Sequence, residues 1–257
     1  MKKILAITNQ KGGVGKTTTS VNLAASLAAT RQRVLLVDLD PQGNATMGSG
    51  VDKRKVAPSV YHVLLGEADI VQARVHSTSG KYDVLPANRE LAGAEIELVD
   101  VEHRERRLKA ALARVEADYD YILIDCPPSL NLLTVNALCA AQAVLIPMQC
   151  EYYALEGLSD LVQTVKKVRE HMNPELEIEG LLRTMYDPRN TLAQQVSAQL
   201  QQHFGDKVYR TVIPRNVRLA EAPSHGLPVL ELDKASKGAK AYLALAGEML
   251  NRAAAIQ

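Results

Sequence analysis

The stretch NQKGGVGKTTTS, residues 9–20, is the most informative part of the chain, because it places a glycine-rich turn between a short apolar run and a helix. The apolar run is Ile4–Ile7, and the helix is expected to begin near Thr17. Glycines at positions 12, 13 and 15 let the backbone turn its N–H groups inward. Together with the first turn of a helix, such groups form a nest for phosphate oxygens. The order of strand, loop, lysine and helix therefore predicts a phosphate-binding loop.

The two lysines of this stretch have different expected roles. Lys16 can reach the β- and γ-phosphates of a nucleotide, and the hydroxyl of Thr17 can hold Mg²⁺. The common form of the motif, GxxxxGK[ST], has a glycine where Gln10 stands, and Lys11 follows it. Phosphate binding alone gives Lys11 no role. The alternative, a glycine-rich turn that binds nothing, is disfavoured by the complete order of elements around the loop.

Length and composition predict a single α/β domain spanning residues 1–257. The chain has 257 residues, of which 47% are apolar and 23% are charged, and this length can bury one large core. Because the net charge is only +1, any basic surface that binds nucleic acid must be local. The three cysteines are odd in number and have no CxxC spacing, which disfavours a disulfide framework or a zinc site and indicates a reducing cytosol.

Membrane segments are not expected. The apolar N-terminal run is too short for a signal peptide, and no run approaches the ~20 apolar residues that span a bilayer. The tail AYLALAGEMLNRAAAIQ, residues 241–257, has helical spacing but little basic charge beside its apolar face, which disfavours a membrane-targeting helix.

Short apolar runs alternate with stretches whose apolar residues recur three or four positions apart. This alternation predicts a doubly wound, mainly parallel sheet with helices on both faces. The expected strands are Ile4–Ile7, Val34–Val37, Tyr82–Leu85, Tyr121–Ile124, Ala143–Ile146, Ile178–Leu182, Val208–Ile213 and Val229–Leu230. The expected helical stretches are Val21–Ala29, Leu108–Ala117, Leu155–Val168 and Val196–Phe204, and the expected exposed loop is Gly48–Ser59. In such sheets ligands bind beyond the carboxyl ends of the strands.

Three aspartates follow predicted strands at this edge. Asp125 ends an apolar run, and beside a phosphate loop it is suited to hold a Mg²⁺-bound water, although a lone aspartate there is more commonly a cap. Asp38 and Asp40 lie two residues apart, so both share one face if their strand continues that far. Asp40, at the start of the loop, is the better candidate to orient an attacking water. The alternative is an Asp-Pro-Gln-Gly turn with Asp40 as its first residue.

A fourth stretch, residues 211–229, combines a possible base contact with local charge. The amide of Asn216 beside the fixed turn of Pro214 is a candidate reader of an adenine edge. Six basic residues stand against two acidic ones from position 183 to 218: Arg183, Arg189, Lys207, Arg210, Arg215 and Arg218. They form either a solvated basic face or a patch that grips DNA phosphates without reading bases.

At these residues the chain resembles the ParA/MinD family of P-loop ATPases, whose deviant loop has the form KGGxxK[ST]. Residues 11–17 match that form, and VDLDPQGNAT, DCPPSL, QCEYYALEGL and VIPRNVRLAEAPSHG resemble the chromosomal ParA (Soj-type) branch. The resemblance runs from about Lys3 to Glu248. It implies that Lys11 crosses to the nucleotide of a second subunit when two monomers close around two ATP molecules. Such a cation would act much as an arginine finger does.

The resemblance also implies the remaining site residues. Asp40 supports hydrolysis, Thr17 binds Mg²⁺, Asp125 is the Walker B carboxylate, and Glu151 lines the dimer face near Lys11. The phosphate cradle is Gly12, Gly13, Val14, Gly15, Lys16, Thr17 and Thr18. Pro214 and Asn216 match the adenine-side positions, and Arg189 and Arg218 match arginines used for nonspecific DNA binding.

The function implied is an ATP-dependent chromosome or plasmid partitioning switch in the bacterial cytoplasm, associated with the nucleoid. ATP and Mg²⁺ produce a sandwich homodimer, the dimer holds double-stranded DNA nonspecifically, and a ParB-type partner stimulates hydrolysis and release. Because the first strand starts at about Lys3, an N-terminal operator-binding extension is not expected. The alternatives are a MinD-like ATPase acting on a membrane, a metabolic ligase on the same fold, and a ParA relative that positions another cargo.

Overall fold

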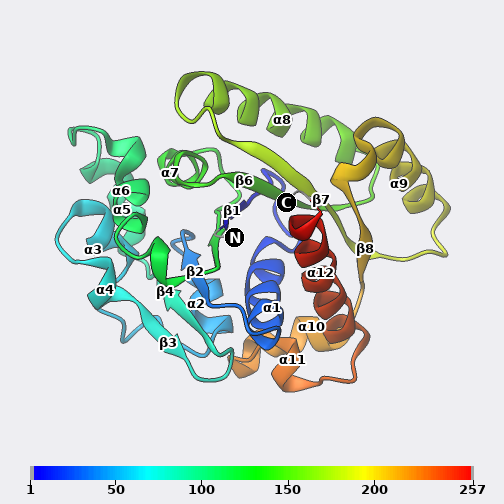
Figure 1. The fold of residues 1–257 in the computed structure, drawn as a ribbon, viewed down its shortest axis with the longest axis horizontal. Helices are drawn as coiled ribbons and strands as arrows, with labels where there is room; N and C mark the ends of the chain where they lie inside the picture. The colour runs from blue at the N-terminus through cyan, green and yellow to red at the C-terminus, as the bar shows by residue number, and fades with distance from the viewer. Residues whose placement is uncertain (1–2, 256–257) are drawn as a thin grey trace.

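A computed structural model describes residues 3–255, which form an eight-stranded sheet with helices on both faces (Figure 1). The strands are β1 Lys3–Ile7, β2 Val34–Asp38, β3 Val75–Ser77, β4 Tyr82–Leu85, β5 Tyr121–Asp125, β6 Ala143–Gln149, β7 Glu177–Tyr186 and β8 Val208–Pro214. The α-helices are α1 Lys16–Ala29, α2 Asn44–Gly48, α3 Val60–Leu65, α4 Ile70–Ala73, α5 Leu91–Glu97, α6 Arg107–Leu112, α7 Leu132–Ala140, α8 Ala154–His171, α9 Thr191–Phe204, α10 Val217–Glu221, α11 Val229–Leu232 and α12 Lys237–Ala254.

The strand order is β3-β4-β2-β5-β1-β6-β7-β8, so β1 lies in the middle of the sheet. Neighbouring strands are parallel except β3, which pairs antiparallel with β4 at one edge. From β1 the chain first builds one half of the sheet and then, through β6, the other. The loop after β1 therefore emerges where the winding direction changes, which is the usual ligand position in a doubly wound sheet.

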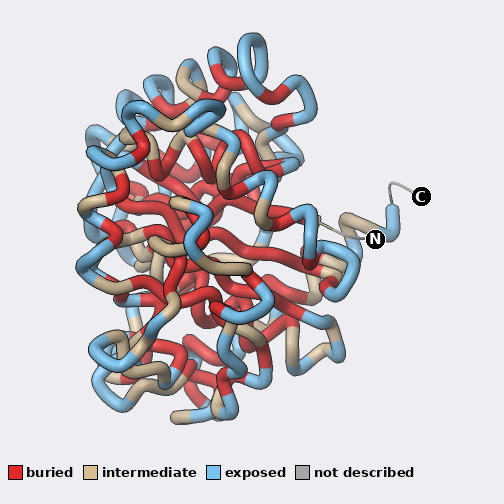
Figure 2. Tube along the Cα trace, turned by 90° about the vertical axis from the view of Figure 1, so that its left-hand side faces the viewer, coloured by how far each residue is buried: buried red, intermediate tan, exposed pale blue. Residues whose placement is uncertain are grey.

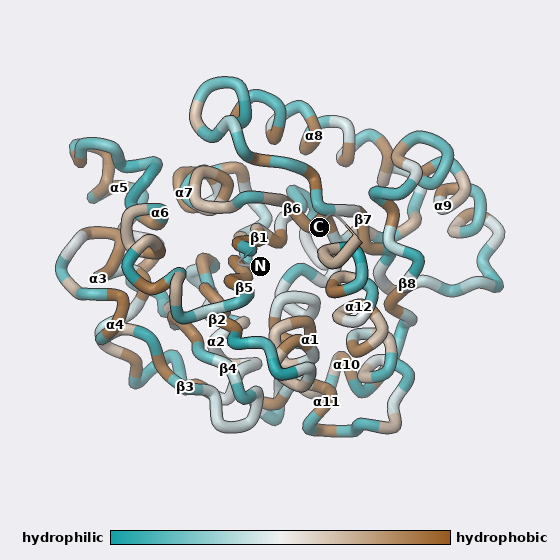
Figure 3. The backbone as a smooth tube through the Cα atoms, in the orientation of Figure 1, coloured by the Kyte–Doolittle hydropathy of each residue, from teal (hydrophilic) through white to brown (hydrophobic). Residues whose placement is uncertain are grey.

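The sheet separates two hydrophobic cores. Successive side chains of β1 alternate between them: Leu5 and Ile7 pack on the side of α1 and α12, and Ile4 and Ala6 on the side of α7 and α8. Figure 2 shows the buried segments running through the interior, and Figure 3 shows hydrophobic residues concentrated in the central strands. Strands covered on both faces explain why the sequence shows apolar runs rather than alternation.

The predicted fold class is confirmed, with three differences in its elements. The helical stretch expected over Leu108–Ala117 ends at Leu112, the last residue of α6. Val229–Leu230, expected as a strand, begins the short helix α11 directly after Pro228. The edge strand Val75–Ser77 was not predicted, because three residues with an exposed histidine at the centre give no periodic signal. The predicted loop, residues 48–59, contains no helix or strand beyond the last residue of α2.

Candidate nucleotide-binding site

The loop between β1 and α1 forms an open cradle of backbone N–H groups. Gly15 is the N-cap of α1 with a φ of 86°, and Gly13 has a φ of 73°, both in the left-handed region that favours glycine. As a glycine, the N-cap has no side chain to cap the helix, and the first turn of α1 has no acidic residue. The first N–H groups of the helix are therefore free to bind an anion.

Neighbouring strands hold this loop in place. The hydroxyl of Thr184 in β7 donates to the carbonyl of Val14 at 2.7 Å, and the amide of Gln149 in β6 donates to the carbonyl of Gly13 at 3.3 Å. Neither residue was predicted from the sequence. The only sequence feature that points to them is their position near the carboxyl end of a strand. This feature is weak, because many residues at such positions do not contact the loop.

The structure separates the two lysines. Lys16 is 7% exposed, and its Nζ donates to the carbonyl of Lys11 at 3.0 Å. Burial lowers the pKa of Lys16, while the nearby carboxylate of Asp125 acts in the opposite direction. The side chain of Lys11 points elsewhere and forms an ion pair with Glu151 at 2.5 Å, with both side chains about half exposed. Lys16 is thus inside the cradle, and Lys11 is at its surface.

Asp125 organises the start of α1. The hydroxyl groups of Thr17 and Ser20 each donate to one oxygen of this carboxylate at 2.8 Å. Asp125 is fully buried, and burial, followed by the charge of Asp38, raises its pKa. A hydroxyl and a carboxylate beside a phosphate cradle are hard oxygen donors of the kind Mg²⁺ prefers, so these residues fit that ion. Ser20 was not identified from the sequence.

Asp38 and Asp40 have different environments. Because β2 ends at Asp38, the strand does not continue to Asp40, so the condition under which alternation would place both on one face is not met. Asp38 is fully buried and accepts the N–H and the hydroxyl of Thr46 at 2.8 and 2.7 Å. Asp40 is partly exposed, and one oxygen accepts the N–H of Gln42 at 2.9 Å. The turn beginning at Asp40 is therefore present, and it leaves the second oxygen of this carboxylate without a hydrogen bond from the described residues.

A cleft of about 430 Å³ lies beside the cradle. It is lined by the start of α1, by α2, and by the segment after α10: Thr17, Thr18, Val21, Asn22, Asn44, Met47, Ala222, Pro223, Ser224 and Leu227. Neither Pro214 nor Asn216 lines it, and the Asn216 side chain instead accepts the N–H of Leu219 at 3.3 Å as the N-cap of α10. The adenine role of these two residues stays a prediction.

The basic segment is divided between surface and core. Arg189 is 89% exposed and pairs with Asp187 at 2.8 Å, and Arg218 pairs with Glu221 at 2.8 Å. Arg183 cannot contribute to a surface patch, because it is buried and donates to Ser197 and to the carbonyls of Tyr209 and Arg210. Its inclusion among the patch residues was an error: its position in β7 turns it inward.

The C-terminal helix packs on the body of the domain. Tyr242, Leu245 and Met249 of α12 are buried in the core shared with α1. Within residues 3–255, no helix is both long and apolar enough to cross a membrane. The three cysteines are buried and unbonded to one another.

Comparisons with known proteins agree with this geometry. Residues 2–178 match a family model described as an AAA domain. The chain is 59% identical to the sporulation initiation inhibitor protein Soj of Bacillus subtilis over 249 residues, which cover 97% of this chain and 98% of the relative. It is 54% identical to the chromosome partitioning protein ParA of Caulobacter vibrioides over 252 residues, covering 97% and 94%.

A similar solved structure carries a different name. The crystal structure of cobyrinic acid a,c-diamide synthase from Mycobacterium smegmatis with bound ADP and magnesium has a TM-score of 0.87 and 40% identity. The match covers 100% of this chain and 97% of that one. In chemical terms, the site described here has an anion cradle, a buried lysine, a hydroxyl beside a carboxylate and a second carboxylate near the opening. These groups suit the binding and hydrolysis of a nucleoside triphosphate.

Proposed function

The chain belongs to the ParA/Soj family of chromosome-partitioning P-loop ATPases, and from that membership we propose that it is a DNA-partition switch controlled by ATP-dependent dimerisation. The observation that carries the proposal is the separation of the two lysines: Lys16 lies inside the phosphate cradle, and Lys11 lies at its surface. A lysine outside the cradle is available to a nucleotide held by another subunit.

ATP and Mg²⁺ are the cofactors, and residues of the loop are proposed to hold them. The backbone of residues 12–15, Lys16 and Thr18 contact the phosphates, and Thr17 ligates the ion, with Asp125 positioning the Thr17 hydroxyl. Bound Mg²⁺ neutralises charge on the phosphate oxygens. The contact of Lys16 with the carbonyl of Lys11 must break when Lys16 turns to the phosphates, so nucleotide binding acts directly on the backbone of Lys11.

Dimerisation is proposed to place Lys11 against the nucleotide of the second subunit. Its ion pair with Glu151 is about half exposed, so exchanging it for a phosphate contact costs little free energy. Asp40 is proposed to orient the attacking water, because it lies at the mouth of the site. One of its carboxylate oxygens accepts the N–H of Gln42, and the other accepts no hydrogen bond from the described residues. A ParB-type partner would then stimulate hydrolysis and return the protein to monomers.

DNA binding is proposed to use Arg189 and Arg218 of both subunits. In the free chain each pairs with an acidic neighbour, so a single copy binds phosphates weakly. A dimer doubles the number of contacts on one DNA molecule, and joined weak sites bind far more tightly than separate ones. The protein would act in the cytoplasm on the nucleoid. Residues 1–257 would work as one ATPase domain, and the single continuous eight-stranded sheet supports this proposal.

The experiment that tests the proposal measures DNA binding by the purified protein with ATP, with ADP and without nucleotide, each with and without a candidate centromere-binding protein. We expect salt-sensitive DNA binding only with ATP, and faster ATP turnover when DNA and the partner are both present. DNA affinity that is equal in all three nucleotide states would contradict the switch.

The name of the Mycobacterium smegmatis structure favours one second candidate, an ATP-dependent amide-forming synthase. Supplying cobyrinic acid and ammonia in place of DNA and partner protein separates the two functions, because a synthase would form the amide and consume ATP with it. A membrane-acting ATPase is opposed by the burial of the apolar face of α12, and co-sedimentation with liposomes and ATP tests it. A ParA relative that positions another cargo would use the same chemistry, so only the identity of its partner protein distinguishes it.

A further inference from the structure

Asn9 lies where the chain leaves β1 for the phosphate loop, and it is only 8% exposed. β1 runs parallel to β6, and just beyond β1 the N–H of Thr8 still donates to the carbonyl of Leu145 at 3.2 Å. The backbone ladder stops there, because the next hydrogen-bonding position of β6 is Pro147, which has no N–H. The carbonyl of Pro147 instead accepts the side-chain amide of Asn9 at 2.9 Å. The Asn9 side chain thus continues the contact with β6 where the backbone cannot.

The oxygen of the same amide holds Lys11. Oδ1 of Asn9 accepts the N–H of Lys11 at 3.0 Å. Because the carbonyl of Pro147 needs a donor and this N–H needs an acceptor, the two neighbours determine which way the amide faces. Residues 10–12 are exposed, so packing against the rest of the domain does not hold them. A buried side chain therefore fastens the backbone of Lys11 to the sheet.

Nucleotide binding changes what holds the backbone of Lys11. In the free chain Nζ of Lys16 donates to the carbonyl of Lys11, and this bond must break when Lys16 turns to the phosphates. Within residues 3–255, the hydrogen bond to Asn9 is the other one that the backbone of Lys11 forms. Asn9 then holds Lys11 on one side of its Cα atom while the other side is released.

The rest of the cradle is held independently of Asn9. Side chains from β6 and β7 donate to the carbonyls of Gly13 and Val14 at 3.3 and 2.7 Å. Loss of the Asn9 amide therefore releases Lys11 and spares the groups that bind phosphate.

We propose that Asn9 is the positioning residue of Lys11 and fixes the point from which its side chain reaches the nucleotide of the second subunit. The proposal rests on the proposed function of Lys11 in the dimer. Because lysine has a long, flexible side chain, a fixed backbone lowers the conformational entropy that is lost when its ammonium group meets a phosphate. Asn9 acts in this role through the backbone of Lys11 alone.

The test compares Asn9→Ala with wild type and with Lys11→Ala, in the presence of a nonhydrolysable ATP analogue. Calorimetry measures the affinity for the analogue, and analytical ultracentrifugation measures the dissociation constant of the dimer. We expect Asn9→Ala to bind the analogue within about threefold of wild type and to dimerise at least about tenfold more weakly, as Lys11→Ala does. In steady-state ATP turnover, its kcat should fall while its KM stays within about threefold of wild type.

The outcomes separate the role of Asn9 from that of Lys11. Wild-type dimerisation by Asn9→Ala, with Lys11→Ala impaired, would overturn the positioning role and leave the role of Lys11 intact. Wild-type dimerisation by both variants would contradict the proposed function of Lys11 and the positioning role with it. Loss of analogue binding by Asn9→Ala would make Asn9 a structural residue of the whole loop and would also overturn the proposal.

Asn9→Ser separates the two contacts of the amide. The serine hydroxyl can accept the N–H two residues further on, as it does in turns, but it is one bond shorter than the amide and should lose the contact with Pro147. This variant should recover part of the dimerisation that alanine loses. A serine variant that dimerises as weakly as the alanine variant would show that the contact with the N–H of Lys11 has no effect, and would overturn the proposal.

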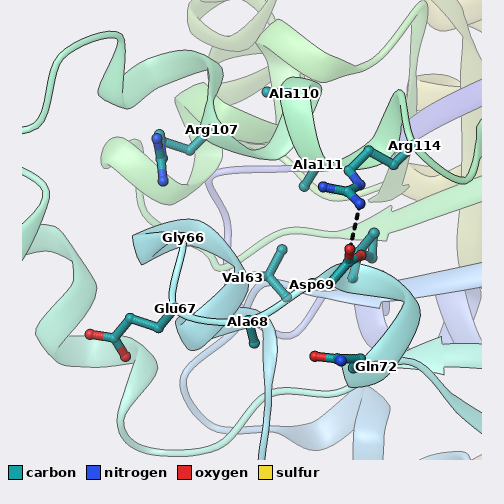
Figure 4. Close-up of a pocket in the computed structure, with 11 residues that line it drawn as sticks. Val63, Gly66, Glu67, Ala68, Asp69, Gln72, Arg107, Ala110, Ala111 and Arg114 are labelled. Atoms are coloured by element: carbon teal, nitrogen blue, oxygen red, sulfur yellow. Dashed lines mark ion pairs between the residues drawn. The ribbon is translucent and has the colours of Figure 1, made fainter.

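Two control variants measure the effect of lost stability. Asn173 is 2% exposed, and its amide donates to the carbonyls of Leu138 and Ala141 at 2.9 and 2.7 Å, so Asn173→Ala removes a buried amide of the same kind outside the phosphate loop. Arg114 pairs with Asp69 at 2.6 Å in a cleft between α6 and the turn that joins α3 to α4 (Figure 4). None of the residues that line this cleft lines the cleft beside the phosphate loop, so Arg114→Gln removes a charge far from the nucleotide.

Both control variants should dimerise and turn over ATP as wild type does. Urea midpoints of all variants report the loss of stability, and Asn173→Ala should lose at least as much as Asn9→Ala, because each loses a buried amide. Equally weak dimerisation by Asn173→Ala would show that instability, rather than the position of Lys11, weakens the dimer, and would overturn the proposal.

Discussion

Replacement of Thr46 by valine should destabilise the protein strongly, because its hydroxyl joins two buried polar groups. The hydroxyl donates to Asp38 at 2.7 Å and accepts the N–H of Ala87 at 2.9 Å, and both Thr46 and Asp38 are fully buried. Valine has nearly the same shape, so it removes both contacts without leaving a cavity.

The magnitude follows from the two contacts. Losing a hydrogen bond to a charged group costs about 1.5–3 kcal/mol, and leaving the buried N–H of Ala87 without a partner costs about 1–3 kcal/mol. The added methyl group offsets about 0.8 kcal/mol. We therefore expect Thr46→Val to lower the free energy of unfolding by about 2–5 kcal/mol in urea titrations read by circular dichroism.

Serine provides the matched control. Thr46→Ser keeps the hydroxyl and removes one methyl group, so its loss should be about 1 kcal/mol. A value for Thr46→Val within 1 kcal/mol of wild type would refute the assignment of these hydrogen bonds. A serine variant as unstable as the valine variant would mean that the methyl group, rather than the hydroxyl, holds this turn.

Three further predictions concern the site and its charges. Asp40→Ala should trap an ATP-bound dimer, seen as a larger species in size-exclusion chromatography, and a monomer in ATP would contradict its hydrolytic role. Replacing Arg189 and Arg218 with Glu should abolish salt-sensitive DNA binding and spare ATP-driven dimerisation. The control Arg169→Glu, on α8, should change neither property. Unchanged DNA affinity in the double variant would contradict the assignment of Arg189 and Arg218 to DNA binding. The pKa of Asp125 is raised from 3.8 to about 8 by burial and by a neighbouring carboxylate, so the stability that its proton contributes is complete below about pH 4 and is lost as the pH rises through about 8. Without Mg²⁺, the urea midpoint should therefore fall between pH 6 and pH 9 more in wild type than in Asp125→Asn, and parallel slopes would contradict the shift.

The sequence predicts the phosphate loop well because every determinant is local. Strand, glycines, Lys16 and helix follow one another directly within residues 3–29, and tertiary packing adds only supporting contacts such as that from Thr184. The carboxylate of Asp125 is predictable for a related reason, since parallel strands bring their carboxyl ends to one edge.

The failures come from information that is not local. Arg183 carries the same formal charge as Arg189, and only its inward direction on β7 separates a buried structural residue from a surface one. The end of β2 at Asp38 cannot be read from the sequence, because a buried apolar residue, Leu39, follows it directly. Val229–Leu230 is apolar enough for a strand, but Pro228 directly precedes it and it forms a helix that packs beside α1.

The contact of the Arg107 guanidinium with the end of α3 shows what sequence cannot supply. In the sequence Arg107 is one of several basic residues in a charged segment, and nothing distinguishes it from Arg106 or Lys109. Its position depends on the turn at Gly66, about forty residues earlier, and on the carbonyl that α3 presents at its end. Contacts of this kind exist only after two helices have packed together.

The central claim is that Lys16 binds the nucleotide of its own subunit and Lys11 acts on that of the partner subunit. The most direct measurement determines nucleotide affinity and dimerisation together for Lys11→Ala and Lys16→Ala, by calorimetry with a nonhydrolysable ATP analogue and by analytical ultracentrifugation. We predict that Lys16→Ala loses nucleotide binding, and that Lys11→Ala keeps near wild-type affinity for the analogue as a monomer that does not bind DNA. A Lys11→Ala protein that dimerises with the analogue at wild-type concentrations would contradict the account.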